Sequence, residues 1–241
     1  MTGGLKALLQ RHGVLPLSRE NPTRNARCSE FEVDNWAISQ FVLRKLVPIV
    51  GTHPFPLHEL MLMVGVVCRL QPPQIFEWGT HVGKSGRIFH ECVTHYAIDA
   101  DIHSTDLPDD VSHGEHPHGE RGRLVHGRVG VHLYQGDGLD TSLEIYRAAG
   151  RKPGPLFLLD GDHSYESVLR ELTSITREVP DAAVLLHDTF YQSKESGYNT
   201  GPHQAIGEVL AALPARYRTL HSGLGLPGMT LLYCPPSRKD T

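Results

Sequence analysis

The stretch Ile75–Gly86, "IFEWGTHVGKSG", joins an apolar run to a glycine-rich turn and then to a helical pattern. The apolar residues before Gly79 predict a buried strand, and residues 83–96 predict the helix that follows it. Glycines in such a turn let the backbone approach a bound molecule closely. The stretch therefore predicts the first strand–turn–helix unit of an α/β fold, with a ligand site at the turn.

The turn ends in Gly-Lys-Ser, as the phosphate-binding loop of nucleoside triphosphatases does, but its spacing differs. That loop needs four residues between its glycines, whereas three residues separate Gly79 from Gly83. Trp78 cannot replace the first glycine, because a tryptophan does not adopt a positive φ cheaply. Glu77 would also repel a phosphate group. We therefore expect a different ligand, and we expect Lys84 to be a solvated residue at the start of the helix.

The remainder of the chain repeats the alternation of apolar runs and helical patterns. This alternation predicts a Rossmann-like, doubly wound, mostly parallel sheet of seven strands. Strands are expected in 74–80, 100–107, 131–138, 154–165, 182–190, 217–222 and 228–236, and helices in 33–50, 58–70, 83–96, 141–149, 166–179 and 201–213.

Polar residues follow the expected parallel strands at the points where they end. In a doubly wound sheet, ligands bind outside the carboxyl ends of the strands. The sequence therefore predicts a functional edge composed of Glu77, Asp106, Asp137, Asp160, Asp162, His187 and Asp188.

The length and composition suit one α/β domain, residues 55–241, with a helical extension, residues 1–54, as a lid or a homo-oligomer contact. A net charge of −4 and the absence of a long basic run argue against nucleic-acid and anionic-membrane partners. The apolar run 60–68 is shorter than the ~20 residues of a membrane span. Four cysteines without a CxxC pair indicate a reducing compartment, so we expect a cytoplasmic protein.

The segment 77–85, "EWGTHVGKS", fits the pattern E-x-G-T-x-x-G-x-S. It resembles the first motif of class I methyltransferases that use S-adenosylmethionine (SAM). The form is that of catechol-O-methyltransferase-like enzymes and of the macrocin and cephalosporin-hydroxylase-like (methyltransferase 24 type) family. The segments 136–138, 158–172 and 199–210 resemble later motifs of that family, and the resemblance covers about residues 55–235.

The resemblance implies SAM as the cofactor. Glu77 would orient its aminoacyl end, Asp106 would bind the ribose hydroxyls, and Asp137 would lie near the adenine amine. The implied SAM-binding set is completed by Gly79, Thr80, Gly83, Ser85 and Asp160.

The resemblance also implies a divalent metal, magnesium in the family, that assists methyl transfer to a hydroxyl. Asp160 and Asp188 correspond to metal ligands, and Asp162 or the nearby His163 to the catalytic base. His187 stands where the family often has a second acid, and histidine suits transition metals better than magnesium. The identity of the metal and its presence therefore stay open.

These features favour a SAM-dependent methyltransferase acting on a hydroxyl of a small molecule, such as a sugar or a secondary metabolite of natural product biosynthesis. A metal-independent N-methyltransferase, a hydroxylase-like member of the same fold and a non-catalytic SAM- or nucleotide-binding protein remain alternatives. The polar insertion 108–127 contains four potential metal ligands, and we expect it to act as a lid or substrate-facing loop. The four are His113, Glu115, His116 and His118.

Overall fold

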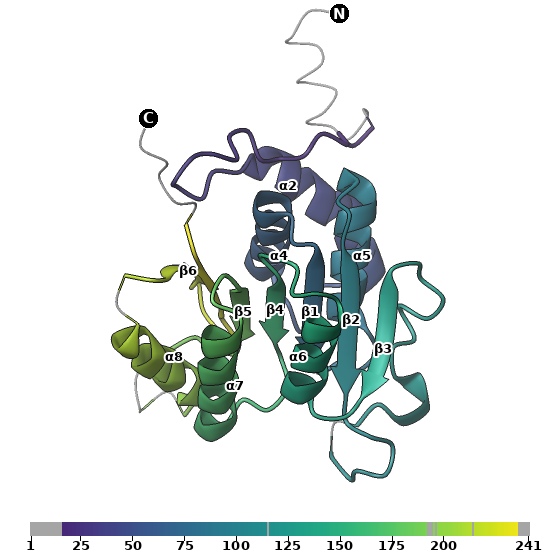
Figure 1. Ribbon diagram of the computed structural model, residues 1–241. Helices are drawn as coiled ribbons and strands as arrows, with labels where there is room; N and C mark the ends of the chain where they lie inside the picture. The colour runs from purple at the N-terminus through teal and green to yellow at the C-terminus, as the bar shows by residue number, and fades with distance from the viewer. Residues whose placement is uncertain (1–15, 115, 192–194, 196, 214, 236–241) are drawn as a thin grey trace, which may run out of the picture.

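The computed structural model describes residues 16–114, 116–191, 195, 197–213 and 215–235. These residues form one seven-stranded sheet in the order β3-β2-β1-β4-β5-β7-β6 (Figure 1). Strands β1 to β5 are parallel, and β7 runs antiparallel to both β5 and β6. The prediction of a mostly parallel, doubly wound sheet is confirmed. The strands are β1 (Gln74–Trp78), β2 (Asp101–Asp106), β3 (Val131–Gln135), β4 (Leu156–Leu159), β5 (Ala183–His187), β6 (Arg218–Ser222) and β7 (Met229–Tyr233).

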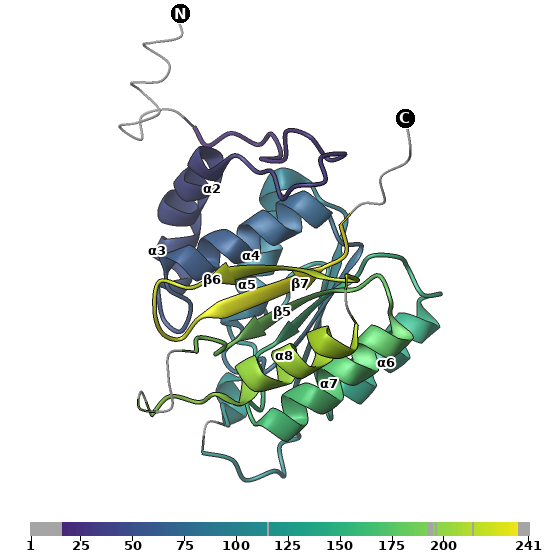
Figure 2. The same ribbon diagram turned by 90° about the vertical axis from the view of Figure 1, so that its left-hand side faces the viewer.

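The central strands are covered on both faces, which explains their continuous apolar sequences. Every residue of β1, β4, β5 and β7 is buried, whereas the edge strands β3 and β6 are partly exposed. Figure 2 shows helices α4 (Leu57–Leu70) and α5 (Lys84–Tyr96) on one face of the sheet. The opposite face carries α6 (Gly138–Ala148), α7 (Tyr165–Glu178) and α8 (Gly201–Ala212).

The N-terminal extension packs on the α4 side of the sheet. The single helix expected over 33–50 consists of α2 (Asn35–Phe41), a π-helical turn η1 (Val42–Leu46) and α3 (Val47–Val50). Its residues Phe41 and Leu46 are buried in the same core as the apolar face of α4.

The described start of the extension, residues 16–34, lies at the amino ends of the strands (Figure 1). Arg69, near the end of α4, donates to the carbonyl of Ala26 at 2.9 Å, and Arg218, at the start of β6, donates to that of Ser29 at 2.8 Å. Residues 16–34 are therefore not placed as a lid over the carboxyl edge. The loop 51–56, by contrast, reaches that edge, where Phe55 contacts the ring of His187. Residues 1–15 of the expected extension lie outside the described part.

Two further findings concern the core and the membrane. Cys68 on α4 and Cys92 on α5 are fully buried core residues, with their Sγ atoms 3.9 Å apart. Across the described ranges, no helix combines the length and the apolar character that crossing a membrane requires.

Candidate active site at the carboxyl edge of the sheet

The turn after β1 requires glycine at both ends. Gly79 has φ +90° and Gly83 has φ +86°, and a Cβ atom on Gly79 would collide with the backbone oxygen of Asp160. A Cβ on Gly83 would come within 2.9 Å of Val125. The turn therefore abuts the residues that follow β4, and the two parts of the edge share one surface.

Glu77 lies beneath this turn and is 1% exposed. Its Oε1 accepts a hydrogen bond of 2.5 Å from Ser104, whose hydroxyl lies 2.6 Å from that of Thr80. Burial raises the pKa of Glu77 to about 7, against the lowering effect of hydrogen bonds from Ser104 and Ser85. Its Oε2 has no hydrogen-bond partner within the described chain. Glu77, Thr80 and Ser85 thus support the turn from inside, and one carboxylate oxygen stays available.

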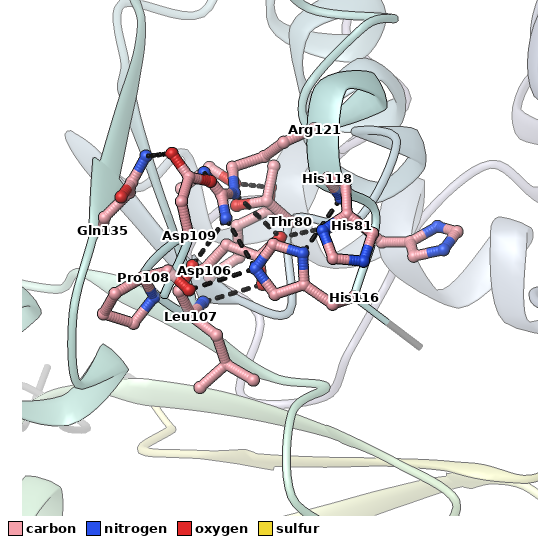
Figure 3. A network of polar contacts seen from close by, with 12 residues as sticks. Thr80, His81, Asp106, Leu107, Pro108, Asp109, His116, His118, Arg121 and Gln135 are labelled. Carbon is pink, nitrogen blue, oxygen red and sulfur yellow. Dashed lines mark hydrogen bonds and ion pairs between the residues drawn. The ribbon is translucent and has the colours of Figure 1, made fainter. Parts of the chain in front are cut away.

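Asp106, at the end of β2, is enclosed by protein donors (Figure 3). Its Oδ2 accepts from the backbone N–H of His81 at 2.9 Å, and its Oδ1 accepts from the N–H of Leu107 at 2.8 Å. The Nε of Arg121 lies 3.6 Å from Oδ2. The acid expected to bind ribose hydroxyls is thereby oriented and neutralised by this chain.

Arg121 comes from the polar insertion and holds it against the sheet. Its guanidinium donates to Asp109 and to the carbonyl of Leu107, each at 2.6 Å. The insertion also bonds to the glycine turn, since the N–H of Gly122 donates to the carbonyl of His81 at 2.8 Å. Between the insertion and β3 lies a cavity of about 510 Å³. The insertion therefore forms a wall beside Asp106. Its described residues include the short helix η2 (His118–Glu120).

The histidines of the insertion are not grouped as a metal site among the described residues. His116 is 8% exposed, its Nε2 lies 3.1 Å from the carbonyl of Pro108, and its Nδ1 accepts from the N–H of His118 (Figure 3). Both nitrogens of His116 thus contact protein atoms. Glu115 lies outside the described residues.

Asp137, after β3, caps helix α6. Its carboxylate accepts from the N–H of Asp140 at 2.9 Å and from Arg170 at 2.8 Å. Burial would raise the pKa of Asp137, but these two donors outweigh it and lower that pKa. Its placement near an adenine amine stays a prediction.

The ends of β4 and β5 bring three side chains together that could hold a metal ion: Asp160, His163 and His187. The Oδ1 of Asp160 lies 2.8 Å from Nδ1 of His187 and 3.8 Å from Nε2 of His163. Asp188 borders this group, with its Oδ2 3.4 Å from Nε2 of His163 and its Oδ1 3.7 Å from Nδ1 of His187. The hydroxyl of Tyr198 donates to Asp188 at 2.6 Å.

The other side of the His187 ring faces α4 and the loop before it. Its Nε2 lies 3.1 Å from Oε2 of Glu59, a carboxylate with 0% exposure, and its ring meets Phe55 edge-on at 5.0 Å. Burial alone would lower the pKa of His187, but its contacts with Asp160 and Glu59 raise that pKa to about 10. Without a ligand, His187 is therefore an imidazolium between two acids.

Asp162 points elsewhere. Its carboxylate accepts from the N–H of Ser164 at 2.9 Å and from the hydroxyl of Ser167 at 2.6 Å, at the start of α7. The hydrogen bond from Ser167 lowers the pKa of Asp162. The structure thus groups His163, and not Asp162, with Asp160 and His187.

Three residues of the edge were not identified from the sequence. Glu59 is an acid within the otherwise apolar run of α4, and this unusual position could have identified it. No feature of the sequence pointed to Arg121 or Tyr198. Lys84 differs from the expectation, because its Nζ donates to the carbonyl of His53 at 2.5 Å instead of being only solvated.

No protein-family model matches the chain, and no curated protein matches it by sequence. The search of solved structures does find similar folds. One is the O-methyltransferase TomG from Streptomyces achromogenes, in complex with SAM and involved in tomaymycin synthesis. The TM-score is 0.55 at 15% identity, over 98% of this chain and 100% of that chain.

Two further structures are similar over most of their length. The O-methyltransferase from Bacillus cereus, in complex with SAH, has a TM-score of 0.52 at 15% identity, covering 82% of this chain and 90% of that chain. The calicheamicin methyltransferase CalS11 has a TM-score of 0.53 at 16% identity, covering 83% and 90%. The chain therefore has the Rossmann-like fold on which these methyltransferases are built.

Proposed function

We propose that the protein is a SAM-dependent methyltransferase that transfers a methyl group to a hydroxyl of a small molecule. The observation that carries the proposal is the contact between the glycine turn and Asp160. Because Gly79 abuts the backbone of Asp160, a donor held by the turn would lie beside His163 and His187. Transfer requires this juxtaposition of donor and acceptor sites.

The residues at the β1–β3 ends fit SAM in charge and in shape. The two glycines leave room for close backbone approach, and Glu77 retains an unpaired, buried Oε2 that suits an ammonium group. Asp106 and Asp137, although paired with Arg121 and Arg170, offer carboxylate oxygens that can accept from hydroxyl and amine groups of a donor. SAM supplies an electrophilic methyl group, so the protein has to position the acceptor and accept its proton.

The residues at the β4–β5 ends fit a divalent metal, which would be held by Asp160, His187 and either His163 or Asp188. A metal bound there would lower the pKa of a coordinated hydroxyl. In the metal-free chain His163 is the better candidate for the proton acceptor, because Asp162 is engaged at the start of α7. With His163 bound to a metal, Asp188 would take this role.

A metal-free mechanism is the second candidate, and the direct 2.8 Å contact between His187 and Asp160 favours it. In that case the His187 imidazolium supplies the positive charge near the acceptor.

Two of the structurally similar proteins suggest the class of acceptor: TomG is involved in tomaymycin synthesis, and CalS11 is a calicheamicin methyltransferase. We therefore propose a natural-product or sugar hydroxyl as the acceptor.

Calorimetry with SAM and radiolabelled methyl transfer to a panel of hydroxylated small molecules test the proposal. We expect micromolar SAM binding, no binding of ATP with magnesium, and label transfer to at least one hydroxyl. Binding of ATP in place of SAM would overturn it. SAM binding with transfer only to amines would replace O-methylation by N-methylation.

A further inference from the structure

Glu59 is a buried acid with no regular hydrogen bond. It lies in the first turn of α4 with 0% exposure, and neither carboxylate oxygen has a hydrogen-bond partner among the described residues. A buried carboxylate without a partner is costly to keep in a protein interior. Its contacts are the 3.1 Å approach to Nε2 of His187 and a 3.9 Å approach to Nε2 of His58.

The position of Glu59 determines which nitrogen of His187 faces the carboxyl edge. Oε2 of Glu59 lies on the Nε2 side of the ring, so Nδ1 is the atom that is left to bind something else. Nδ1 points at Oδ1 of Asp160, 2.8 Å away. Phe55 packs against the ring from the preceding loop, so the ring has little freedom to turn.

The atoms that converge on this side of His187 are spaced like metal ligands. The Oδ1 of Asp160 lies 2.8 and 3.8 Å from the two imidazole nitrogens, and the atoms of the three side chains all lie within 4.8 Å of one another. Tetrahedral ligands with bonds of ~2.05 Å lie about 3.3 Å apart. The group is thus close to a preformed centre.

The donor set decides the class of metal. Two imidazole nitrogens and one carboxylate suit zinc, cobalt, iron or manganese. Magnesium prefers oxygen ligands and releases its water reluctantly. An acid in place of either histidine would have given an oxygen-rich site.

We propose that Glu59 is the outer carboxylate of a divalent transition-metal centre formed by Asp160, His163 and His187. Glu59 takes the Nε2–H of His187 and thereby directs Nδ1 to the metal, as carboxylates behind metal-binding histidines do. Glu59 is a positioning residue, because it touches neither metal nor substrate. The inference rests on the proposed function only in placing the centre at the catalytic edge.

The test uses the full chain, dialysed against a chelator and titrated with Co²⁺ while the visible spectrum is recorded. We expect one Co²⁺ per chain, with an absorption band that reports nitrogen ligands, and loss of that band in His163→Ala. Zn²⁺ should displace Co²⁺, whereas Mg²⁺ in ~1000-fold excess should not. Absence of a 1:1 Co²⁺ complex, or displacement by Mg²⁺, would overturn the metal assignment.

Glu59→Gln tests the positioning role, since glutamine keeps the size of the side chain and removes its charge. We expect Co²⁺ affinity to fall ~10- to 100-fold. Glu91→Gln is the matched control: Glu91 on α5 is also a buried helical carboxylate, but it pairs with Lys45 of η1 and Arg87 of α5. Co²⁺ affinity should be unchanged in that variant. Equal affinities of Glu59→Gln and wild type, with circular dichroism showing both folded, would remove Glu59 from the centre.

SAM calorimetry on the metal-free chain separates this inference from the proposed function. SAM binding without any metal binding would refute the centre and leave the methyltransferase proposal standing. Metal binding without SAM binding would do the reverse.

Discussion

The two halves of the carboxyl edge both end their strands in acids, but the acids have different partners. In the β1–β2 half, Asp106 accepts two backbone N–H groups and lies beside Arg121. In the β4–β5 half, Asp160 faces the imidazole nitrogens of His163 and His187. Fixed amide and guanidinium donors hold the carboxylate of Asp106 in one orientation. Imidazole nitrogens are common metal ligands and proton-transfer groups.

This difference assigns the halves to different tasks. The β1–β2 half is suited to hold a ligand, because fixed donors orient the carboxylate of Asp106. The β4–β5 half is suited to chemistry, because imidazole nitrogens and a carboxylate oxygen converge there. Variants in each half should therefore affect different steps of the reaction.

The largest effect is expected in the β4–β5 half. His163→Ala should lower kcat by ~10²- to 10⁴-fold, the usual contribution of a positioned acid or base. SAM affinity, measured by calorimetry, should stay within about threefold of wild type, because the imidazole is grouped with Asp160 and His187, away from Glu77 and Asp106.

Asp162→Asn is the matched comparison, since Asp162 precedes His163 directly and accepts hydrogen bonds from Ser164 and Ser167 at the start of α7. We expect its kcat to fall by less than about tenfold, with a lower melting temperature because these hydrogen bonds are weakened. If Asp162→Asn loses as much kcat as His163→Ala, the assignment of the base returns to Asp162.

The next effect is expected in the β1–β2 half. Asp106→Asn should weaken SAM binding by about 10- to 100-fold, the range of a charge-assisted hydrogen bond. At saturating SAM its kcat should match that of wild type. A kcat that drops while the dissociation constant of SAM is unchanged would contradict the division between the halves.

A smaller effect is expected at Trp78 and Glu171, which lie beneath the place where the two halves of the edge meet. Trp78 lies under Gly138 and Gly161, and its Nε1–H donates to the buried Glu171 at 3.0 Å. Burial raises the pKa of Glu171 to about 8. Because the folded state favours the protonated carboxyl, its contribution to stability is fully present below about pH 4.5, the pKa of an unburied glutamate. This contribution is lost as pH rises to about 8, the pKa in the folded state.

Glu171→Gln keeps an acceptor for Trp78 and does not titrate. The free energy of unfolding of the variant relative to wild type should therefore rise by on the order of 2 kcal/mol between pH 5 and pH 8, which corresponds to roughly 4–8 °C in Tm. Above about pH 8 this difference should stay constant. Thermal melts at pH 5, 7 and 9 measure this. A difference in Tm that is constant across these pH values would show that Glu171 does not ionise in this range.

The smallest effect is expected at Lys84. Lys84→Met removes one hydrogen bond to the backbone of His53, so we expect a stability loss below about 1 kcal/mol and SAM affinity within about threefold. Urea unfolding and calorimetry measure the two quantities. A large loss of SAM affinity would give the lysine a direct role at the turn, as in a phosphate-binding loop.

The sequence predicted the acids at the strand ends because their positions follow from local patterns. Glu77 is the penultimate residue of β1, Asp106 is the last residue of β2 and Asp160 follows β4. Parallel strands bring their carboxyl ends to one edge. The spacing of Gly79 and Gly83 was likewise readable, because a positive φ is a property of the local backbone. These features required no knowledge of distant contacts.

Only the tertiary structure decided which groups meet at that edge. Asp162 and His163 are neighbours in sequence, yet Asp162 accepts from Ser167 of α7 and His163 joins Asp160 and His187. Glu59 reaches His187 across 128 positions of the chain. The partner of a buried charge is set by packing between elements and not by local pattern. The sequence by itself therefore determined the fold and the acidic edge, and the packing of α4 against β5 determined what that edge can do.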